Sequence, residues 1–202
     1  MTYLPAGERR RLIVDAAIEV IATEGLAQAT TRRIAERAGT PRGTIHYCFR
    51  DKDELIMVVL GRAGATMRTA FEGLDPAAGL EATLRAVVAT YWQWIRDHLG
   101  LHLALMELTM WVIRNKDSVL PASRDVWAAV NGPLGGDLIR SALESAADAD
   151  GVRPAVAVAD LTRFLIHRMD GLVFEYAETS DPAGCSRQAG LLADALIALA
   201  RP

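Results

Sequence analysis

Apolar residues recur at helical spacing along most of the chain, and no segment shows the strict alternation of a half-buried strand. The first clear case is a helix that ends near Gly25 and whose apolar face consists of Ile13, Ala16, Ala17, Val20 and Ile21. Later, the same spacing, broken by glycine and proline, predicts helices over residues 76–99, 101–115, 122–149, 155–179 and 183–200. The third of these would be kinked or divided by Gly132, Pro133, Gly135 and Gly136. The pattern predicts an all-α fold of about nine helices.

Two short helices joined by a glycine turn are predicted between residues 30 and 49. Thr30 can cap the first, which has Ile34, Ala35 and Ala38 on its apolar face, and Gly39 can adopt the positive φ that ends it. This helix would therefore be short and anchored on one side only.

The second short helix, at about residues 41–48, is predicted to have Thr40 as its cap and Pro41 at its first position. Its inward residues, at i, i+3, i+4 spacing, are Ile45, Cys48 and Phe49, and its outward residues are Arg42, Gly43, Thr44, His46 and Tyr47. A helix that is held by its apolar face and presents donors near its N-terminus fits the major groove of DNA.

The next helix is predicted to open at Lys52, with Asp51 as its cap and Glu54 as the reciprocal partner. This start would place the Lys52 ammonium beside free backbone amides, where both could hold one phosphate oxygen of a DNA strand.

The stretch from about Glu8 to Leu60 resembles the N-terminal domain of TetR-family transcriptional regulators. The resemblance is carried by Thr-Thr-Arg-Arg-Ile-Ala, which begins at Thr30, and by Gly-Thr-Ile-His-Tyr-x-Phe-x-x-Lys-x-Glu-Leu, which begins at Gly43. Two positions depart from the family pattern: His46 stands where tyrosine is usual, and Cys48 stands where histidine is common.

This resemblance implies a ligand-responsive transcriptional regulator, expected to be a repressor, with a recognition helix at about 41–48 and a double-stranded DNA operator as its partner. The residues it assigns to DNA contact are Thr31, Arg32, Arg42, Gly43, Thr44, His46, Tyr47 and Lys52. We expect residues 1–55 to form the helix-turn-helix domain and residues 56–202 to form a helical domain for effector binding and dimerisation.

The net charge of −3 is unfavourable for a protein that binds nucleic acid. Residues 1–55 hold nine Lys/Arg against eight Asp/Glu, whereas the remainder holds thirteen against seventeen. Because the first segment is only weakly basic, DNA binding must rely on the local placement of cations and on the pairing of two subunits.

Resemblance to the family implies a homodimer formed through the last two helices. Apolar stripes that fit this role are Leu161, Phe164, Leu165, Leu172, Val173 and Tyr176 on the first helix, and Leu191, Leu192, Ala195, Leu196 and Leu199 on the second. The same stripes could instead complete the core of one subunit.

Aromatic and soft side chains of the later helices could line a pocket for an unidentified small-molecule effector. The candidates are Trp92, His98, His102, Met106, Trp111, Trp127, His167 and Asp170. These residue types also build ordinary cores, and for any single one the core is the commoner role. His167 and Asp170 could simply make an interhelical hydrogen bond.

Several classes of site are not expected. His98 and His102 are four residues apart, but no Cys or HExxH pattern joins them, so neither a metal nor another cofactor is expected. The chain lacks a phosphate loop, a nucleophile elbow and a dinucleotide fingerprint, which argues against an enzyme. Cys48 is interpreted as a packing thiol rather than a redox sensor. The alternative function is a helical small-molecule-binding protein or enzyme without DNA recognition.

No apolar signal region follows the start, and no run of eighteen apolar residues occurs. We therefore expect a cytoplasmic protein with no membrane partner.

Overall fold

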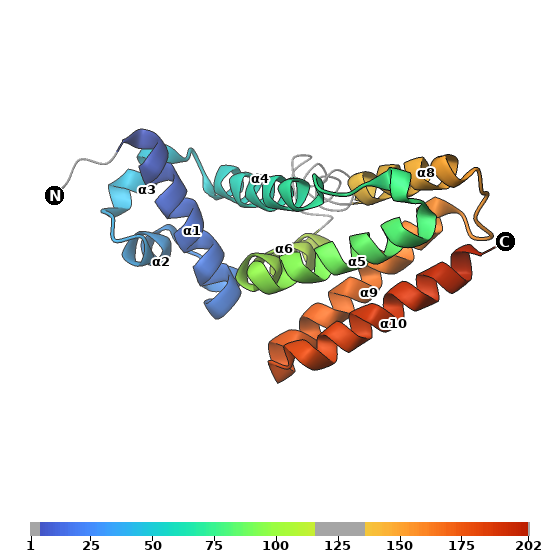
Figure 1. Cartoon of the computed structure of the whole chain (residues 1–202). Helices are drawn as coiled ribbons and strands as arrows, with labels where there is room; N and C mark the ends of the chain where they lie inside the picture. Colours follow the sequence, from blue (N-terminus) through green and yellow to red (C-terminus); the bar gives the residue numbers. More distant parts are fainter. Residues whose placement is uncertain (1–4, 116–135, 202) are drawn as a thin grey trace. The chain divides into compact units, whose positions relative to one another are not determined.

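A computed structural model describes residues 5–115 and 136–201, apart from the side chains of residues 52, 53, 112 and 115. These residues form nine α-helices and two 3₁₀ helices, with no strand among them (Figure 1). The α-helices are α1 (Ala6–Glu24), α2 (Thr31–Arg37), α3 (Arg42–Cys48), α4 (Lys52–Phe71), α5 (Leu80–Asp97), α6 (Leu99–Asn115), α8 (Gly136–Asp150), α9 (Val158–Thr179) and α10 (Pro182–Ala200). The 3₁₀ helices are η1 (Leu26–Gln28) and η2 (Pro76–Ala78). The predicted all-α fold is confirmed, and none of the described helices is long and apolar enough to cross a membrane.

The described residues divide into two compact units. Unit 1 takes in the chain up to Ala63 and the part of α6 that begins at Gly100, and unit 2 takes in Gly64–Leu99 and the residues from Gly136 onward. Helix α4 contributes residues to both units.

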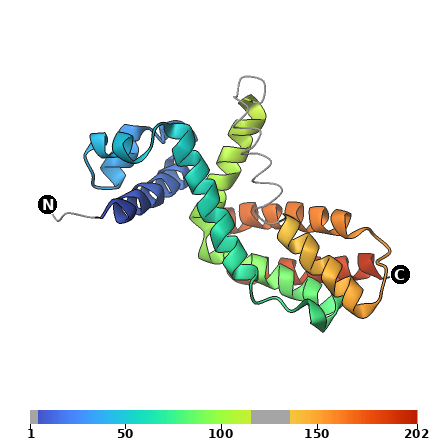
Figure 2. The same ribbon diagram turned by 90° about the horizontal axis from the view of Figure 1, so that it is seen from above.

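In unit 1, α2 and α3 fold against α1 (Figure 2). The apolar face predicted for α1 is buried, from Ile13 to Ile21, and Gly25 ends the helix with a φ of 87°. Ile34 and Ile45 bring the apolar sides of α2 and α3 into the same core. Each short helix is thus held by its inward side chains, because seven residues alone would not form a stable helix in water.

The turn between α2 and α3 explains the glycine that the sequence places there. Gly39 has a φ of 62°, and its amide donates to the carbonyl of Glu36 at 3.2 Å. The Thr40 amide donates to the carbonyl of Ala35 at 3.0 Å, which completes a Schellman motif. At the other end of α2, the Thr30 hydroxyl accepts a hydrogen bond from the Arg33 amide, so the cap predicted at Thr30 is confirmed.

The predicted start of α3 was wrong by one residue. Pro41, not Thr40, is the N-cap, and no side chain caps this helix. Among the described residues, the buried Thr40 hydroxyl oxygen has no hydrogen-bond partner.

Helix α6 is attached to the N-terminal helices within unit 1. The Glu107 carboxylate accepts a hydrogen bond from the backbone amide of Leu26, at the start of η1, at 3.1 Å. The break predicted at Gly100 falls two residues earlier, because His98 ends α5 and α6 begins at Leu99. The four-residue spacing of His98 and His102 is consequently interrupted by a helix boundary. The predicted kink at residues 132–136 lies outside the described residues except for Gly136, which begins α8.

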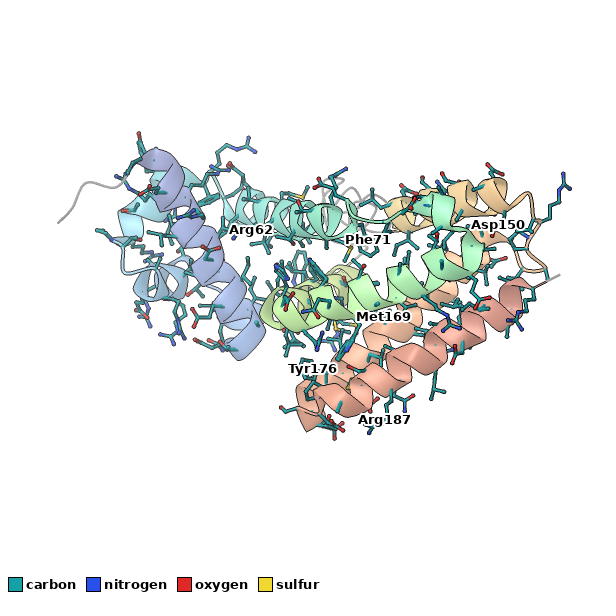
Figure 3. The ribbon with its side chains drawn as sticks, in the orientation of Figure 1. Arg62, Phe71, Asp150, Met169, Tyr176 and Arg187 are labelled. Atoms are coloured by element: carbon teal, nitrogen blue, oxygen red, sulfur yellow. The ribbon has the colours of Figure 1, made fainter. Side chains whose placement is uncertain are left out.

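In unit 2, α5 packs against α8, α9 and α10. Asp150, labelled in Figure 3 at the end of α8, accepts a hydrogen bond from the Leu80 amide at 2.7 Å and so satisfies a free donor at the start of α5. Gly79 precedes that start with a φ of 92°, and a Cβ there would lie 2.5 Å from the Asp150 carboxylate. Glycine is therefore required by both the backbone and the close carboxylate.

A run of aromatic side chains fills part of unit 2. Phe71 meets Tyr91 edge to face, and Tyr91 meets Trp94 in the same way, with centroid distances of 6.3 and 6.2 Å. The His98 ring stacks on Trp94 at 5.4 Å. Burial raises the pKa of Tyr91 well above its usual range, and the nearby Asp170 carboxylate acts in the same direction.

Candidate nucleic-acid interface

The two faces of α3 differ sharply in exposure. Ile45 and the adjoining Phe49 are each 2% exposed, whereas Tyr47 is 78% exposed. Arg42 and His46 are also exposed. The helix therefore presents cationic and hydrogen-bonding side chains while its apolar side holds it to unit 1.

The remaining α3 residues fit the same division. Thr44 is half-buried, and Gly43 is exposed with open space where a Cβ would stand. Cys48 was predicted to face inward and is half-buried, and it is a free thiol.

Helix α2 carries two more of the residues assigned to DNA contact, Thr31 and Arg32. Thr31 is half-buried at its first position. The Arg32 side chain is 77% exposed and lies 3.5 Å from the Glu36 carboxylate one turn later. An exposed pair of this kind is weak, so it leaves Arg32 available to an anionic partner.

Ion pairs inside unit 1 neutralise several of its other cations. Arg33 binds Glu24 at 2.7 Å and Arg37 binds Glu19 at 2.7 Å, both across the α1–α2 contact. The Arg33 hydrogen bond is the main reason that the pKa of Glu24 is lowered. Arg42, by contrast, has no carboxylate partner among the described residues. Arg33 and Arg37 are thus paired within unit 1, whereas Arg42 of α3 has its charge exposed.

The start of α4 is built as predicted, with one difference. The Asp51 carboxylate accepts from the Glu54 amide at 2.8 Å, so Asp51 acts as the cap. Glu54 reaches back to the amide of Arg50 at 2.9 Å rather than to that of Asp51. Lys52 is the first residue of α4, but its side chain lies outside the described part of the structure.

Residues 13–58, which span α1 to the first turns of α4, match the family model of bacterial regulatory proteins, tetR family. The chain carries a DNA-binding domain of the TetR family. The resemblance inferred from the motifs is confirmed, and the protein is a DNA-binding transcriptional regulator.

Similarity to known TetR-family proteins extends over most of the chain. Over 178 residues the sequence is 29% identical to the HTH-type nicotine-responsive transcriptional repressor HdnoR of Paenarthrobacter nicotinovorans, an alignment that covers 87% of each protein. The crystal structure of SCO7518 from Streptomyces coelicolor A3(2) superposes with a TM-score of 0.67 and 25% identity over 96% of this chain and 99% of that one. FadR from Bacillus subtilis, crystallised with stearoyl-CoA, superposes with a TM-score of 0.71 and 19% identity over 92% and 96%, and shows the same fold.

The residues proposed for an effector pocket do not all belong to one unit of this TetR-family chain. Those in unit 2 are Trp92, His98, His167 and Asp170, those in unit 1 are His102, Met106 and Trp111, and Trp127 lies outside the described residues. Trp92 is buried, and its indole NH donates to the Ser186 hydroxyl at 2.8 Å, which accounts for its polar atom.

The four histidine and aspartate candidates also lie in different settings. His102 is buried, whereas the His167 side chain is 64% exposed. His167 lies 3.9 Å from Asp170 on the same helix. No cluster of three or more potential metal ligands lies among the described residues.

The apolar stripes of α9 and α10 serve mainly the core of unit 2. Buried members of the stripes are Leu161, Leu165, Leu172, Val173, Leu192 and Leu196. Exposed members are Phe164, Leu191, Ala195 and Leu199, and Tyr176 is half-buried. Phe174, which is 63% exposed, was missed because it falls outside the periodic stripe. We call Phe164, Phe174, Leu191 and Leu199 the exposed apolar set.

Proposed function

We propose that this TetR-family regulator is a repressor that binds a pseudo-palindromic operator as a homodimer and leaves it when a small molecule binds the helical region after α3. The observation that carries the proposal is the exposure of Tyr47 and Arg42 on a helix whose opposite side is anchored by Ile45 and Phe49. We assign DNA binding to residues 1–55 and effector binding and dimerisation to residues 56–202.

Base recognition and backbone contact are assigned to different side chains. Arg42, Thr44, His46 and Tyr47 face the major groove, while Thr31, Arg32 and Lys52 contact phosphate or a nearby base. Gly43 lets the backbone of α3 approach the groove, because nothing lies within 4 Å of where its Cβ would be. The exposure of α3 and the absence of an ion pair at Arg42 among the described residues support this division.

The test begins by selecting duplexes from a random-sequence library with the wild-type protein. Arg42→Ala and Tyr47→Ala should weaken binding to the selected duplex by about 5- to 150-fold and leave nonspecific binding nearly unchanged. Lys52→Ala should weaken both and reduce the slope of log K against log salt by about 0.9. Failure to enrich any sequence would refute the proposal, and equal loss on all sequences for all three variants would refute the division of roles.

The exposed apolar set supports dimerisation through α9 and α10. Figure 1 shows these helices running beside each other in unit 2, and Phe174 and Leu191 are their most exposed large apolar side chains, at 63% and 62%. Exposed apolar clusters of this kind mark contact with another protein. A second copy of the chain is the partner that a pseudo-palindromic operator requires, because each recognition helix reads one half-site.

The proposed effector is an organic small molecule. HdnoR is nicotine-responsive and FadR holds stearoyl-CoA, so members of the same fold differ widely in what they bind. Within unit 2, the candidate His98 stacks on Trp94, and the candidate Trp92 meets Tyr176 of α9 edge to face at 5.3 Å. Ligand binding would shift the dimer between two arrangements through α4, with coupling of about 1–3 kcal/mol.

Nicotine and stearoyl-CoA are the first probes for the effector. A compound that binds as the effector should raise the melting temperature of the wild-type protein and release the protein from the selected duplex. His98→Ala should diminish both effects. Release that His98→Ala and Trp92→Phe leave unchanged would contradict the assigned residues.

A further inference from the structure

Arg10 on α1 makes three contacts with the segment that ends α3 and begins α4. Its Nη1 donates to the backbone oxygen of Cys48, the last residue of α3. Its Nη2 donates to the Glu54 carboxylate at 2.9 Å. The guanidinium also lies 4.3 Å from the centroid of the Phe49 ring. One planar group therefore joins α1 to the end of one helix and the start of the next.

Glu54 extends this arrangement to the turn between the helices. Its second carboxylate oxygen accepts from the Arg50 amide at 2.9 Å, while its own amide is capped by Asp51. The Arg10 hydrogen bond and the Arg50 amide together lower the pKa of Glu54 to about 2. The carboxylate is thus ionised at neutral pH and bonded on both oxygens.

The contact at Cys48 matters because α3 has few other restraints at this end. The last carbonyls of a helix lack partners within it, and α3 is only seven residues long. Arg10 supplies a charged donor to one of these carbonyls, and its ring contact lies on Phe49, which is the C-cap of the helix. Arg10 therefore adds a restraint from α1 at the end of α3 that lies next to Tyr47.

Arg10 differs in this respect from Arg11, the next residue in the helix. Its side chain is 39% exposed, and its two terminal nitrogens are both engaged in hydrogen bonds within unit 1. Arg11, the next residue, is exposed, and no ion pair joins it to a carboxylate among the described residues. Two of the five guanidinium donors of Arg10 are thus directed to a carbonyl and a carboxylate of the same unit, which holds the group against the end of α3.

We propose that Arg10 is a positioning residue for operator recognition, which acts through the Cys48 carbonyl, Phe49 and Glu54 and does not contact DNA. This inference rests on the proposed function, because it concerns the same recognition helix. The fork of the guanidinium is essential to it, since a lysine ammonium can make one of these contacts but cannot bridge all three.

The experiment compares Arg10→Gln, Arg10→Lys and Arg11→Gln in the full chain, each bound to the duplex that the wild-type protein selects and to a scrambled duplex. Arg10→Gln and Arg10→Lys should both weaken binding to the selected duplex by at least about tenfold, with the salt slope and the scrambled-duplex affinity unchanged. Arg11→Gln removes the same charge from the same helix and should change the two affinities by equal factors.

A Glu54→Gln variant provides an independent readout. It should reproduce the specific loss, and combining it with Arg10→Gln should add little, because both changes break the same bridge. All binding is measured well below the melting temperature of each variant. If Arg10→Gln fails to fold, the specific affinities of Arg10→Lys and Glu54→Gln test the inference.

Two outcomes would overturn the inference. A salt slope reduced by about 0.9 in Arg10→Gln, with affinity restored by Arg10→Lys, would identify Arg10 as a phosphate contact. Unchanged specific affinity in the Arg10 and Glu54 variants would show that the bridge has no part in recognition. Failure of the wild-type protein to select any duplex would instead refute the proposed function itself, so the two failures are distinguishable.

Discussion

Helices α3 and α10 each bury one face and expose the other, but the exposed faces differ in chemistry. Helix α3 exposes Arg42, His46 and Tyr47, whereas α10 exposes Leu191 and Leu199. A cationic and hydrogen-bonding face fits an anionic partner such as DNA, and an apolar face fits another protein surface. The comparison teaches that burial alone identifies neither site, and that the exposed residues of each helix indicate the kind of partner.

The largest effect is expected from a matched pair on α10. Leu196 is fully buried, so Leu196→Arg should destabilise the chain by more than about 4 kcal/mol, because a charge enters the core without a partner. Leu191 is 62% exposed, and Leu191→Arg should change the free energy of unfolding by less than about 0.5 kcal/mol. Chemical denaturation measures both.

The same pair tests the assignment of the dimer surface. Leu191→Arg should lower the mass in solution to that of one chain while the protein stays folded, and binding to the selected duplex should fall sharply. A dimer that persists in Leu191→Arg and in Phe174→Arg would remove the exposed apolar set from the interface.

A second pair of variants tests whether the buried and exposed faces of α3 have separate roles. Ile45→Ala should destabilise unit 1 by about 2–4 kcal/mol, because it leaves a cavity at a side chain that is only 2% exposed. Tyr47→Ala should leave thermal stability nearly unchanged and reduce only specific DNA binding. If Tyr47→Ala destabilised the protein as much as Ile45→Ala does, the two faces would not be separate, and the comparison with α10 would fail.

These pairs also show what could be predicted from the sequence. The faces of α1, α2 and α3 follow from spacing, capping and glycine, which act within a few residues, and the polar face of α3 was identified correctly. The stripes of α9 and α10 could not be divided into core and surface, because periodicity reports that a residue is apolar and says nothing about which neighbour covers it. Leu165 and Leu196 illustrate this limit: both lie in the stripe predicted for the dimer, and both are fully buried within the chain.

Arg10 illustrates a second limit. Its three contacts reach residues 38 to 44 positions away, and no local pattern in the sequence links an arginine of α1 to the Cys48 carbonyl. Thr40 shows that a residue type suited to capping does not always become the cap, since Pro41 occupies that position in α3.

A smaller effect is expected at the glycines that flank the start of α3. Gly39 has a φ of 62° and open space at its Cβ position, so Gly39→Ala should cost about 1–2 kcal/mol through backbone strain alone. Gly43 is helical with equally open space, and Gly43→Ala should stabilise the protein by about 0.5–1 kcal/mol. Thermal unfolding of the two variants measures both changes in stability. A gain in both variants, or a loss in both, would contradict the backbone conformation assigned to the turn.

The smallest effect concerns acid stability at the Arg10–Glu54 bridge. Because Arg10 and the Arg50 amide lower the pKa of Glu54 to about 2, below its ordinary value of 4.5, the folded state binds this proton less readily than the unfolded state. The resulting stabilisation is fully present above the unfolded pKa and is lost as the pH falls through the folded pKa. The melting temperature of the wild type should therefore exceed that of Glu54→Gln at neutral pH, and the difference should shrink between about pH 5 and pH 2.

Arg10→Gln is the control for this pH dependence. It removes the largest cause of the lowered pKa but leaves the Arg50 amide in place, so its melting curve should lose part of the acid dependence. A difference between wild type and Glu54→Gln that stayed constant down to about pH 2 would mean that the carboxylate does not titrate with the bridge. In that case the hydrogen bonds of Arg10, rather than the charge of Glu54, would hold the end of α3.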